Sequence, residues 1–155
     1  PNTNVYATSP ADGLVQRFSA TGDPLQTWPG PDPGFDWPLW LAAAPSGDIY
    51  VTEFDLSRVT RWSATGKFKG QWGSAGDGHG EFDEIGAIAV DTAGFVYVAD
   101  QGNQRVQKFT ASGGFVGVIG GPGVFTSPSG IAVSRTGMVY VTDFNGGEIV
   151  QLAPA

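Results

Sequence analysis

The chain of 155 residues contains no cysteine, and it has a single histidine, His79. Without cysteine it can form no disulfide, thiolate metal site or cysteine nucleophile, and its redox compartment stays open. One imidazole cannot supply the two or three histidine ligands that catalytic zinc sites commonly use. We therefore expect no cofactor, no metal centre and no catalytic residue built by this chain alone.

Positive charge is also scarce. Eight Lys and Arg residues stand against fifteen Asp and Glu residues, which gives a net charge of −7. The eight are scattered from Arg17 to Arg135. Strong nucleic-acid binders instead gather roughly 6–10 phosphate contacts on one face. We therefore expect no nucleic-acid partner.

Long hydrophobic runs are missing too. No apolar run approaches the ~18–20 residues that a membrane-spanning helix needs. The first ten residues, PNTNVYATSP, have neither the basic start nor the apolar core of a signal peptide. We expect a soluble chain without a membrane partner. Whether a leader has been removed, and in which compartment the chain works, stay open.

Short apolar runs separated by turn residues are abundant. Residues 86–120 hold four of them, at positions 87–90, 95–99, 105–109 and 115–119. The connectors between them carry Gly, Asn, Asp or Ser, which tolerate tight turns. The pattern predicts a four-stranded antiparallel meander. Such a sheet cannot cover both of its own faces, so it must stack on a similar sheet.

The same kind of strand recurs along the chain, so the chain itself contains the similar sheets. A strand centred on a tyrosine recurs at Tyr6, Tyr50, Tyr97 and Tyr140, with spacings of 44, 47 and 43 residues. A period of about 40–50 residues with four short strands is typical of β-propeller blades. We therefore predict an all-β fold in one domain, residues 1–155. Its four blades span approximately residues 1–30, 38–73, 85–120 and 128–155, the middle two with four strands and the outer two with three.

The segment GDGHGEFDEIGAIAVDTAGFVYVADQGNQRVQKFTASGGFVG, residues 76–117, closely resembles an NHL repeat, the blade unit of a propeller class usually built with six blades. The resemblance covers nearly the whole chain and is strongest over residues 73–152. The first repeat departs most, because it lacks the innermost strand. The resemblance implies that the innermost strands line a central channel. It also implies that the connectors between blades share one face with the corners between the second and third strands, and that ligands bind on this face.

Several residues on that face are candidates for binding. The corner residues are Glu53, Phe54, Asp55, Asp100, Gln101, Asp143 and Phe144. The repeated carboxylates have two interpretations: a ring of acids that binds a cation or a basic peptide, or caps that accept backbone N–H groups in tight turns. The two corner phenylalanines indicate a contact surface.

Two tryptophans, Trp37 and Trp40, flank Pro38 on the same face. They either stack a sugar or a peptide side chain, as in a lectin, or fill the core. The other three tryptophans are expected between blades.

The connector at residues 77–84 offers four carboxylates and His79. Hard cations such as Ca²⁺ take several oxygen ligands, but the spacing does not fit an EF-hand loop. The alternative is an ordinary blade connector with Phe82 plugged between sheets. His79 is either solvated or a single general base.

Three functions follow from these observations. The first is a non-catalytic binding and assembly module whose partner is a second copy, with a protein, peptide or glycan ligand still to be identified. The homodimer would place the first blade, around Val5, Val15 and Leu25, against the partner's last blade, around Val139 and Ile149. Its ring would have six or eight blades, and a four-bladed monomer is the alternative. The second is a part of a larger NHL-propeller enzyme, a lyase or hydrolase, whose further blades supply the missing histidines. The third is a lectin-like carbohydrate or peptide binder.

Overall fold

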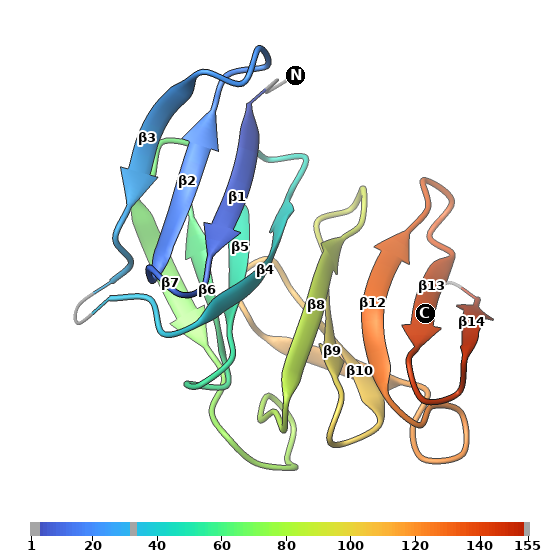
Figure 1. Ribbon diagram of the computed structural model, residues 1–155. Coiled ribbons are helices and arrows are strands. Elements are labelled where there is room, and N and C mark those ends of the chain that lie inside the picture. Colours follow the sequence, from blue (N-terminus) through green and yellow to red (C-terminus); the bar gives the residue numbers. More distant parts are fainter. Residues whose placement is uncertain (1–3, 32–33, 154–155) are drawn as a thin grey trace.

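The computed structural model describes residues 4–31 and 34–153. Fourteen β-strands and no helix lie within these residues, and they form four antiparallel sheets in chain order. Consequently no helix of the described part could cross a membrane. The all-β propeller-type fold predicted from the repeats is confirmed (Figure 1).

Each sheet is one blade, and its strands run outward from the centre of the molecule. The strands of blade 1 are β1 (Val5–Ser9), β2 (Leu14–Phe18) and β3 (Pro24–Trp28). Those of blade 2 are β4 (Pro38–Ala43), β5 (Ile49–Glu53), β6 (Arg58–Trp62) and β7 (Phe68–Trp72). Those of blade 3 are β8 (Ile85–Val90), β9 (Val96–Asp100), β10 (Arg105–Phe109) and β11 (Phe115–Ile119). Those of blade 4 are β12 (Pro128–Val133), β13 (Val139–Asp143) and β14 (Glu148–Leu152).

The turn between the first two strands of a blade needs glycine. Gly47, Gly94 and Gly137 adopt φ angles of 87°, 91° and 85°. Residues with a Cβ atom resist this left-handed region, whereas glycine enters it freely. The recurrence of glycine at this turn is therefore a backbone requirement.

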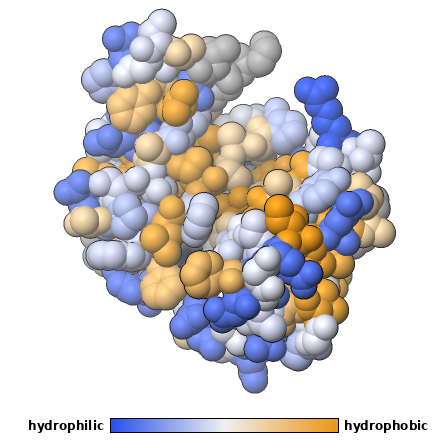
Figure 2. Space-filling view, turned by 45° about the vertical axis from the view of Figure 1, so that its right-hand side comes forward, coloured by the Kyte–Doolittle hydropathy of each residue, from blue (hydrophilic) through white to orange (hydrophobic). Residues whose placement is uncertain are grey.

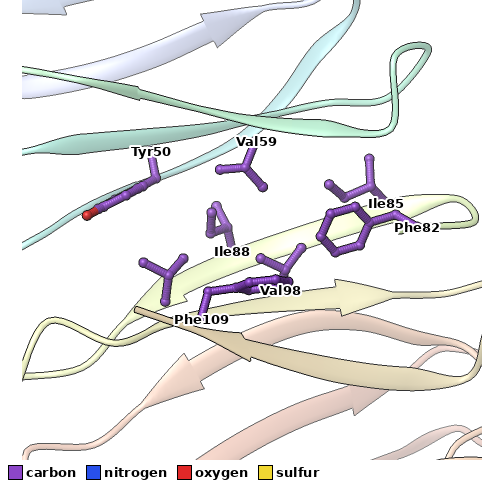
Figure 3. Close-up of a cluster of buried hydrophobic side chains, with 8 residues drawn as sticks. Tyr50, Val59, Phe82, Ile85, Ile88, Val98 and Phe109 are labelled. Atoms are coloured by element: carbon purple, nitrogen blue, oxygen red, sulfur yellow. The ribbon is translucent and has the colours of Figure 1, made fainter. Parts of the chain in front are cut away.

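Three apolar layers hold the blades together, one between each neighbouring pair. Trp28 and Trp62 stack between blades 1 and 2, with ring centroids 6.0 Å apart. Figure 3 shows the layer between blades 2 and 3, where Tyr50 and Val59 face Ile88 and its neighbours on blade 3. The third layer joins blades 3 and 4. Tryptophans of the outer strands thus lie between blades, as expected from the sequence.

The four blades form an open arc. β1 packs on β4, β4 on β8, and β8 on β12, and the two ends of the arc lie apart (Figure 1). Among the described residues, blade 1 therefore has one face without a neighbouring blade, and so does blade 4. The described part of the chain is a partial propeller.

Candidate functional site

The connectors between blades meet the corners between second and third strands on one face of the molecule, as expected. At each junction a carboxylate accepts a hydrogen bond from a backbone N–H of the preceding connector. The three N–O distances are 3.0 Å for Asp36 to Glu53, 2.8 Å for Asp83 to Asp100 and 2.7 Å for Thr126 to Asp143. All three carboxylates are buried. Each one fixes its connector to its own blade.

Further partners engage the same carboxylates. Arg58 pairs with Glu53 at 2.8 Å, and Arg105 pairs with Asp100 at 2.7 Å. Gln107 Nε2 also donates to Asp100, over 3.0 Å. These contacts match the turn-capping interpretation of the corner acids, since Oε2 of Glu53 and both oxygens of Asp100 accept hydrogen bonds from their own blade or its connector. Among the described residues, no group of three or more His, Asp or Glu side chains could hold a metal ion.

Asp143 pairs with no arginine in the part of the chain that the structure describes. Burial alone would raise the pKa of this carboxyl, but hydrogen bonds outweigh burial and lower the pKa from 3.8 to about 2. The donors are the N–H and hydroxyl of Thr126 and the N–H groups of Ser127 and Gly146. Because the donors favour the charged form, Asp143 holds the connector before blade 4 most strongly while it is ionised.

The predicted aromatic residues do lie at the surface. Trp37 is 46% exposed, Trp40 48% and Phe144 78%. The core-filling interpretation of the two tryptophans is therefore wrong. Trp37 adopts a φ of 50° at the entrance to β4, and its carbonyl accepts the N–H of Phe54 over 3.1 Å.

Not all the candidates share one site. Trp37, Trp40, Phe54 and exposed Asp55 belong to blade 2 or its connector, and Phe144 lies on blade 4, with blade 3 between them. Gln101, on blade 3, is half-buried. The structure thus places Trp37, Trp40 and Phe54 at blade 2 and leaves a separate phenylalanine at blade 4.

His79 makes a contact that the sequence reasoning missed. Its ring stacks on Phe115, with centroids 4.1 Å apart and planes 10° from parallel. The connector around it is fastened to blade 3, because the Gly80 N–H donates to Gln107 over 2.9 Å. Phe82 is fully buried between sheets, which confirms its predicted plugging role. The motif offered no signal for the stack, since His79 and Phe115 are far apart in sequence.

The unpaired face of blade 4 is the most unusual surface of the molecule. We call it the leading face, meaning the side where a next blade would lie, and its residues are Ala132, Tyr140, Thr142 and Ile149. Tyr140 is 36% exposed and Ile149 is 69% exposed. The equivalent residues of blades 2 and 3 are fully buried against the next blade: Tyr50, Val59, Tyr97 and Val106. Blade 4 therefore exposes a surface that blades 2 and 3 bury against the next blade, and no described blade packs on it.

This leading face is apolar and slightly hollow. Figure 2 shows strongly hydrophobic surface on the side of the molecule that blade 4 forms. The hollow is lined by Gly130, Ile131, Ala132, Tyr140, Thr142 and Ile149.

Blade 1 exposes the opposite side of a blade, the side that the other blades bury against the preceding blade. We call its unpaired side the trailing face, with Val5, Ala7 and Leu25 as its main apolar residues. Val5 is 54% exposed and Ala7 and Leu25 are also exposed. The equivalents of Val5 in the other blades are fully buried against the preceding blade: Ile49, Val96 and Val139.

The predicted dimer contact needs one correction. Val15 and Val139 were expected in it, but both are fully buried within the chain, against blade 2 and blade 3 respectively. Successive residues of a strand point to opposite faces, so the neighbours of these two valines, and not the valines themselves, face outward. Val5, Leu25 and Ile149 remain at the open faces.

Comparison with known sequences identifies the repeat. The model of the NHL repeat matches residues 82–109. The chain is similar to NHL repeat-containing protein 3 of Homo sapiens, with 31% identity over 121 residues, 68% of this chain and 35% of that protein. It is 26% identical to the Mus musculus protein of the same name over 113 residues, 66% of this chain and 33% of that protein. The chain thus spans about a third of the length of these curated relatives.

Solved structures agree on the fold. A catalytically inactive virginiamycin B lyase from Staphylococcus aureus, crystallised with quinupristin, matches with a TM-score of 0.75 and 20% identity over 96% of this chain and 51% of that chain. The WD40 propeller domain of Doa1 matches with a TM-score of 0.75 and 13% identity over 99% and 48%. At such identities the likeness shows the β-propeller fold alone, with this chain spanning about half of each match. With the repeat and the blade architecture in agreement, the chain belongs to the NHL-repeat β-propeller family.

Proposed function

We propose that this chain is a non-catalytic binding and assembly module that completes its ring by self-association into a homodimer. The observation that supports this is the pair of open blade faces. Ile149 and Tyr140 on blade 4, and Val5 on blade 1, are exposed where every inner blade buries the same positions. Open propeller ends leave apolar sheet faces and unpaired edges, which closure removes.

The length of the chain favours a ring built from two copies. This chain covers 51% of the length of the lyase propeller, so two copies supply about one such ring. Fully burying one isoleucine or valine side chain contributes ~1.5–3 kcal/mol, and a ring closed by two copies has two such junctions. A two-fold axis along the channel makes the two junctions identical.

Light scattering tests self-association. At micromolar concentration we expect a mass near twice the single-chain value of 16.1 kDa. Ile149→Lys, on the leading face, should return the mass to that of one chain. Val118→Lys, at an exposed apolar position on the outer strand of blade 3, is the matched control and should leave the dimer intact. A wild-type mass of 16.1 kDa would overturn the proposal.

The absence of catalysis is tested separately. The candidate base His79 stacks on a phenylalanine, and no nucleophile is hydrogen-bonded to it in the described part of the chain. Purified protein should show no hydrolase or lyase turnover with added divalent metals. Turnover that His79→Ala removes would refute this part of the proposal.

A second candidate is a place within a larger NHL-propeller enzyme, a lyase or hydrolase. The lyase likeness and the partial coverage of the relatives named above favour it. Further blades of the same polypeptide would then cover the open faces and supply the histidines. The intact mass of the source protein decides: a mass near 16.1 kDa eliminates this candidate.

A third candidate is a lectin-like or peptide-binding module. It is favoured by the exposure of Trp37 and Trp40 on the connector face. A ligand that stacks on either indole should change tryptophan fluorescence, and Trp37→Ala together with Trp40→Ala should remove the change. A flat response across glycan and peptide panels would count against it.

A further inference from the structure

Each described junction with a complete following blade includes, in addition to its apolar layer, a hydrogen bond from a tyrosine hydroxyl. The hydroxyl of Tyr6 on blade 1 donates to the carbonyl of Ala64 on blade 2, over 3.1 Å. The hydroxyl of Tyr50 on blade 2 donates to the carbonyl of Ala111 on blade 3, over 2.9 Å. Both acceptors lie in the turn between the third and fourth strands of the following blade. Apolar faces alone allow sliding, whereas a directional hydrogen bond favours one register.

The same turn also receives an indole. A Cβ atom added at Gly66 would lie 2.3 Å from Trp28 of the preceding blade, and one added at Gly113 would lie 2.6 Å from Trp72. The turn is therefore a socket in two parts. Its alanine carbonyl accepts the tyrosine of the preceding blade, and its glycine leaves room for the tryptophan.

Blade 1 has the same kind of turn between β2 and β3, and no described blade covers it. Residues 19–22 and 63–66 share the sequence Ser-Ala-Thr-Gly. Both turns close alike, with Gly22 N–H donating to Ser19 over 3.1 Å and Gly66 N–H donating to Ser63 over 2.9 Å. Nothing lies within 4 Å of a Cβ atom added at Gly22, and Ala20 is exposed.

Blade 4 has the corresponding donor. Tyr140 occupies the position of Tyr50: it pairs with Gln151 of the next strand as Tyr50 pairs with Arg61. Its side chain is exposed on the leading face, and its hydroxyl makes no hydrogen bond to the residues that the structure describes. Donor and socket lie at opposite ends of the arc, so they cannot meet within the described chain (Figure 1).

We propose that Tyr140 of one copy docks into the turn of residues 19–22 of a second copy and donates its hydroxyl to the carbonyl of Ala20. This rests on the self-association proposed above and names its two surfaces and its register. The contact continues the junctions seen between blades 1 and 2 and between blades 2 and 3. It requires a head-to-tail arrangement, because two leading faces placed together would offer Tyr140 no such turn.

Cross-linking tests the arrangement, and the cysteine-free sequence makes it unambiguous. Two single variants, Tyr140→Cys and Ala20→Cys, are mixed and treated with a short bismaleimide. We expect cross-linked dimers from the mixture and little product from either variant alone. The matched positive control is the double variant Tyr6→Cys with Ala64→Cys, which should cross-link within one chain.

The outcomes separate the two proposals. A dimer whose Tyr140→Cys variant cross-links to itself as well as the mixture does would overturn the head-to-tail docking and leave self-association standing. A monomeric wild type would overturn both.

A second variant tests the hydrogen bond without altering shape. Tyr140→Phe should raise the dimer dissociation constant roughly 25-fold, about five-fold for the hydrogen bond lost at each of the two identical junctions. Its melting temperature as a dilute monomer should stay unchanged. A dissociation constant equal to that of wild type would contradict the contact with Ala20.

Discussion

At the residue scale, the buried acid at the same corner of three blades has the same structural role in each. Glu53, Asp100 and Asp143 each accept the backbone N–H of the connector that enters their blade. Glutamate at the first position is compatible because Arg58 holds its longer side chain in place. The repetition therefore reflects backbone satisfaction, since a buried N–H without an acceptor costs about 1–3 kcal/mol.

Acid should release the connector before blade 4 within a defined pH window. The pKa of Asp143 is about 2 in the folded chain, below its ordinary value of 3.8. Its contribution to stability is therefore fully present above pH 4 and is lost as the pH falls from about 4 towards 2. Urea unfolding between pH 6 and 2 should show this loss, and Asp143→Asn should be less stable at pH 6 and have a shallower acid dependence. A variant with an unchanged acid profile would contradict the assignment.

Two glycines should respond differently to substitution. Gly94 needs its φ of 91°, so Gly94→Val should cost at least ~1–2 kcal/mol of unfolding free energy. Gly102 has no positive φ, although a Cβ atom there would lie 2.4 Å from Oδ2 of Asp83. The Asp83 side chain is exposed and can turn away, so Gly102→Ala should cost less. Thermal unfolding compares them, and equal losses of melting temperature would refute the expected order.

Removing the hydroxyl of Tyr50 should lower the thermal stability of dilute protein more than removing the hydroxyl of Tyr140. Tyr50→Phe removes the bond to Ala111 inside the chain, which should cost about 1 kcal/mol and lower the melting temperature by roughly 2–4 °C. Tyr140→Phe in dilute protein has no such bond to lose. Differential scanning calorimetry at low concentration provides the measurement, and similar losses in both variants would argue against the distinction.

At the scale of the strand, position within the arc decides what a residue contributes. Val106 on β10 and Ile149 on β14 occupy equivalent places, yet Val106 is fully buried and Ile149 is mostly exposed. The difference arises because blade 4 covers β10, whereas no described blade covers β14. A sequence pattern of alternating residues cannot distinguish these two cases.

Val106 and Ile149 should therefore respond differently when each is changed to alanine. Val106→Ala should lower the unfolding free energy by about 2 kcal/mol at any protein concentration, because it leaves a cavity between blades. Ile149→Ala should have little effect on dilute protein and should weaken the dimer. Denaturation and sedimentation velocity, measured on both variants, separate the two effects. Strong destabilisation of dilute protein by Ile149→Ala would place that residue inside a core instead.

At the scale of the whole molecule, stability should depend on protein concentration. Folding that is coupled to dimer formation raises the melting temperature as concentration rises. We therefore expect wild-type protein to melt at higher temperature when concentrated, and Ile149→Lys to lose this dependence. Val118→Lys should keep it. A wild-type melting temperature independent of concentration would indicate that the two faces stay open.

The sequence by itself determined the repeat, the number and order of the strands, and the turn glycines. These are local properties: alternation specifies a half-buried strand, and Gly94 specifies a left-handed turn, whatever the rest of the chain does. The matching tyrosines at a spacing near 45 residues then specified stacked blades, since one such sheet cannot cover its own faces.

Only the tertiary structure decided which face of each strand is covered, and which side chains meet across blades. Val15 and Val5 look alike in sequence, but one packs on blade 2 and the other faces outward. The bond from Tyr50 to Ala111 spans 61 residues and depends on the angle between two blades, which no local pattern encodes. Within the described residues, the arc likewise leaves Tyr140 and the turn of residues 19–22 without a contact from another blade, because each end blade has a neighbouring blade on one side only.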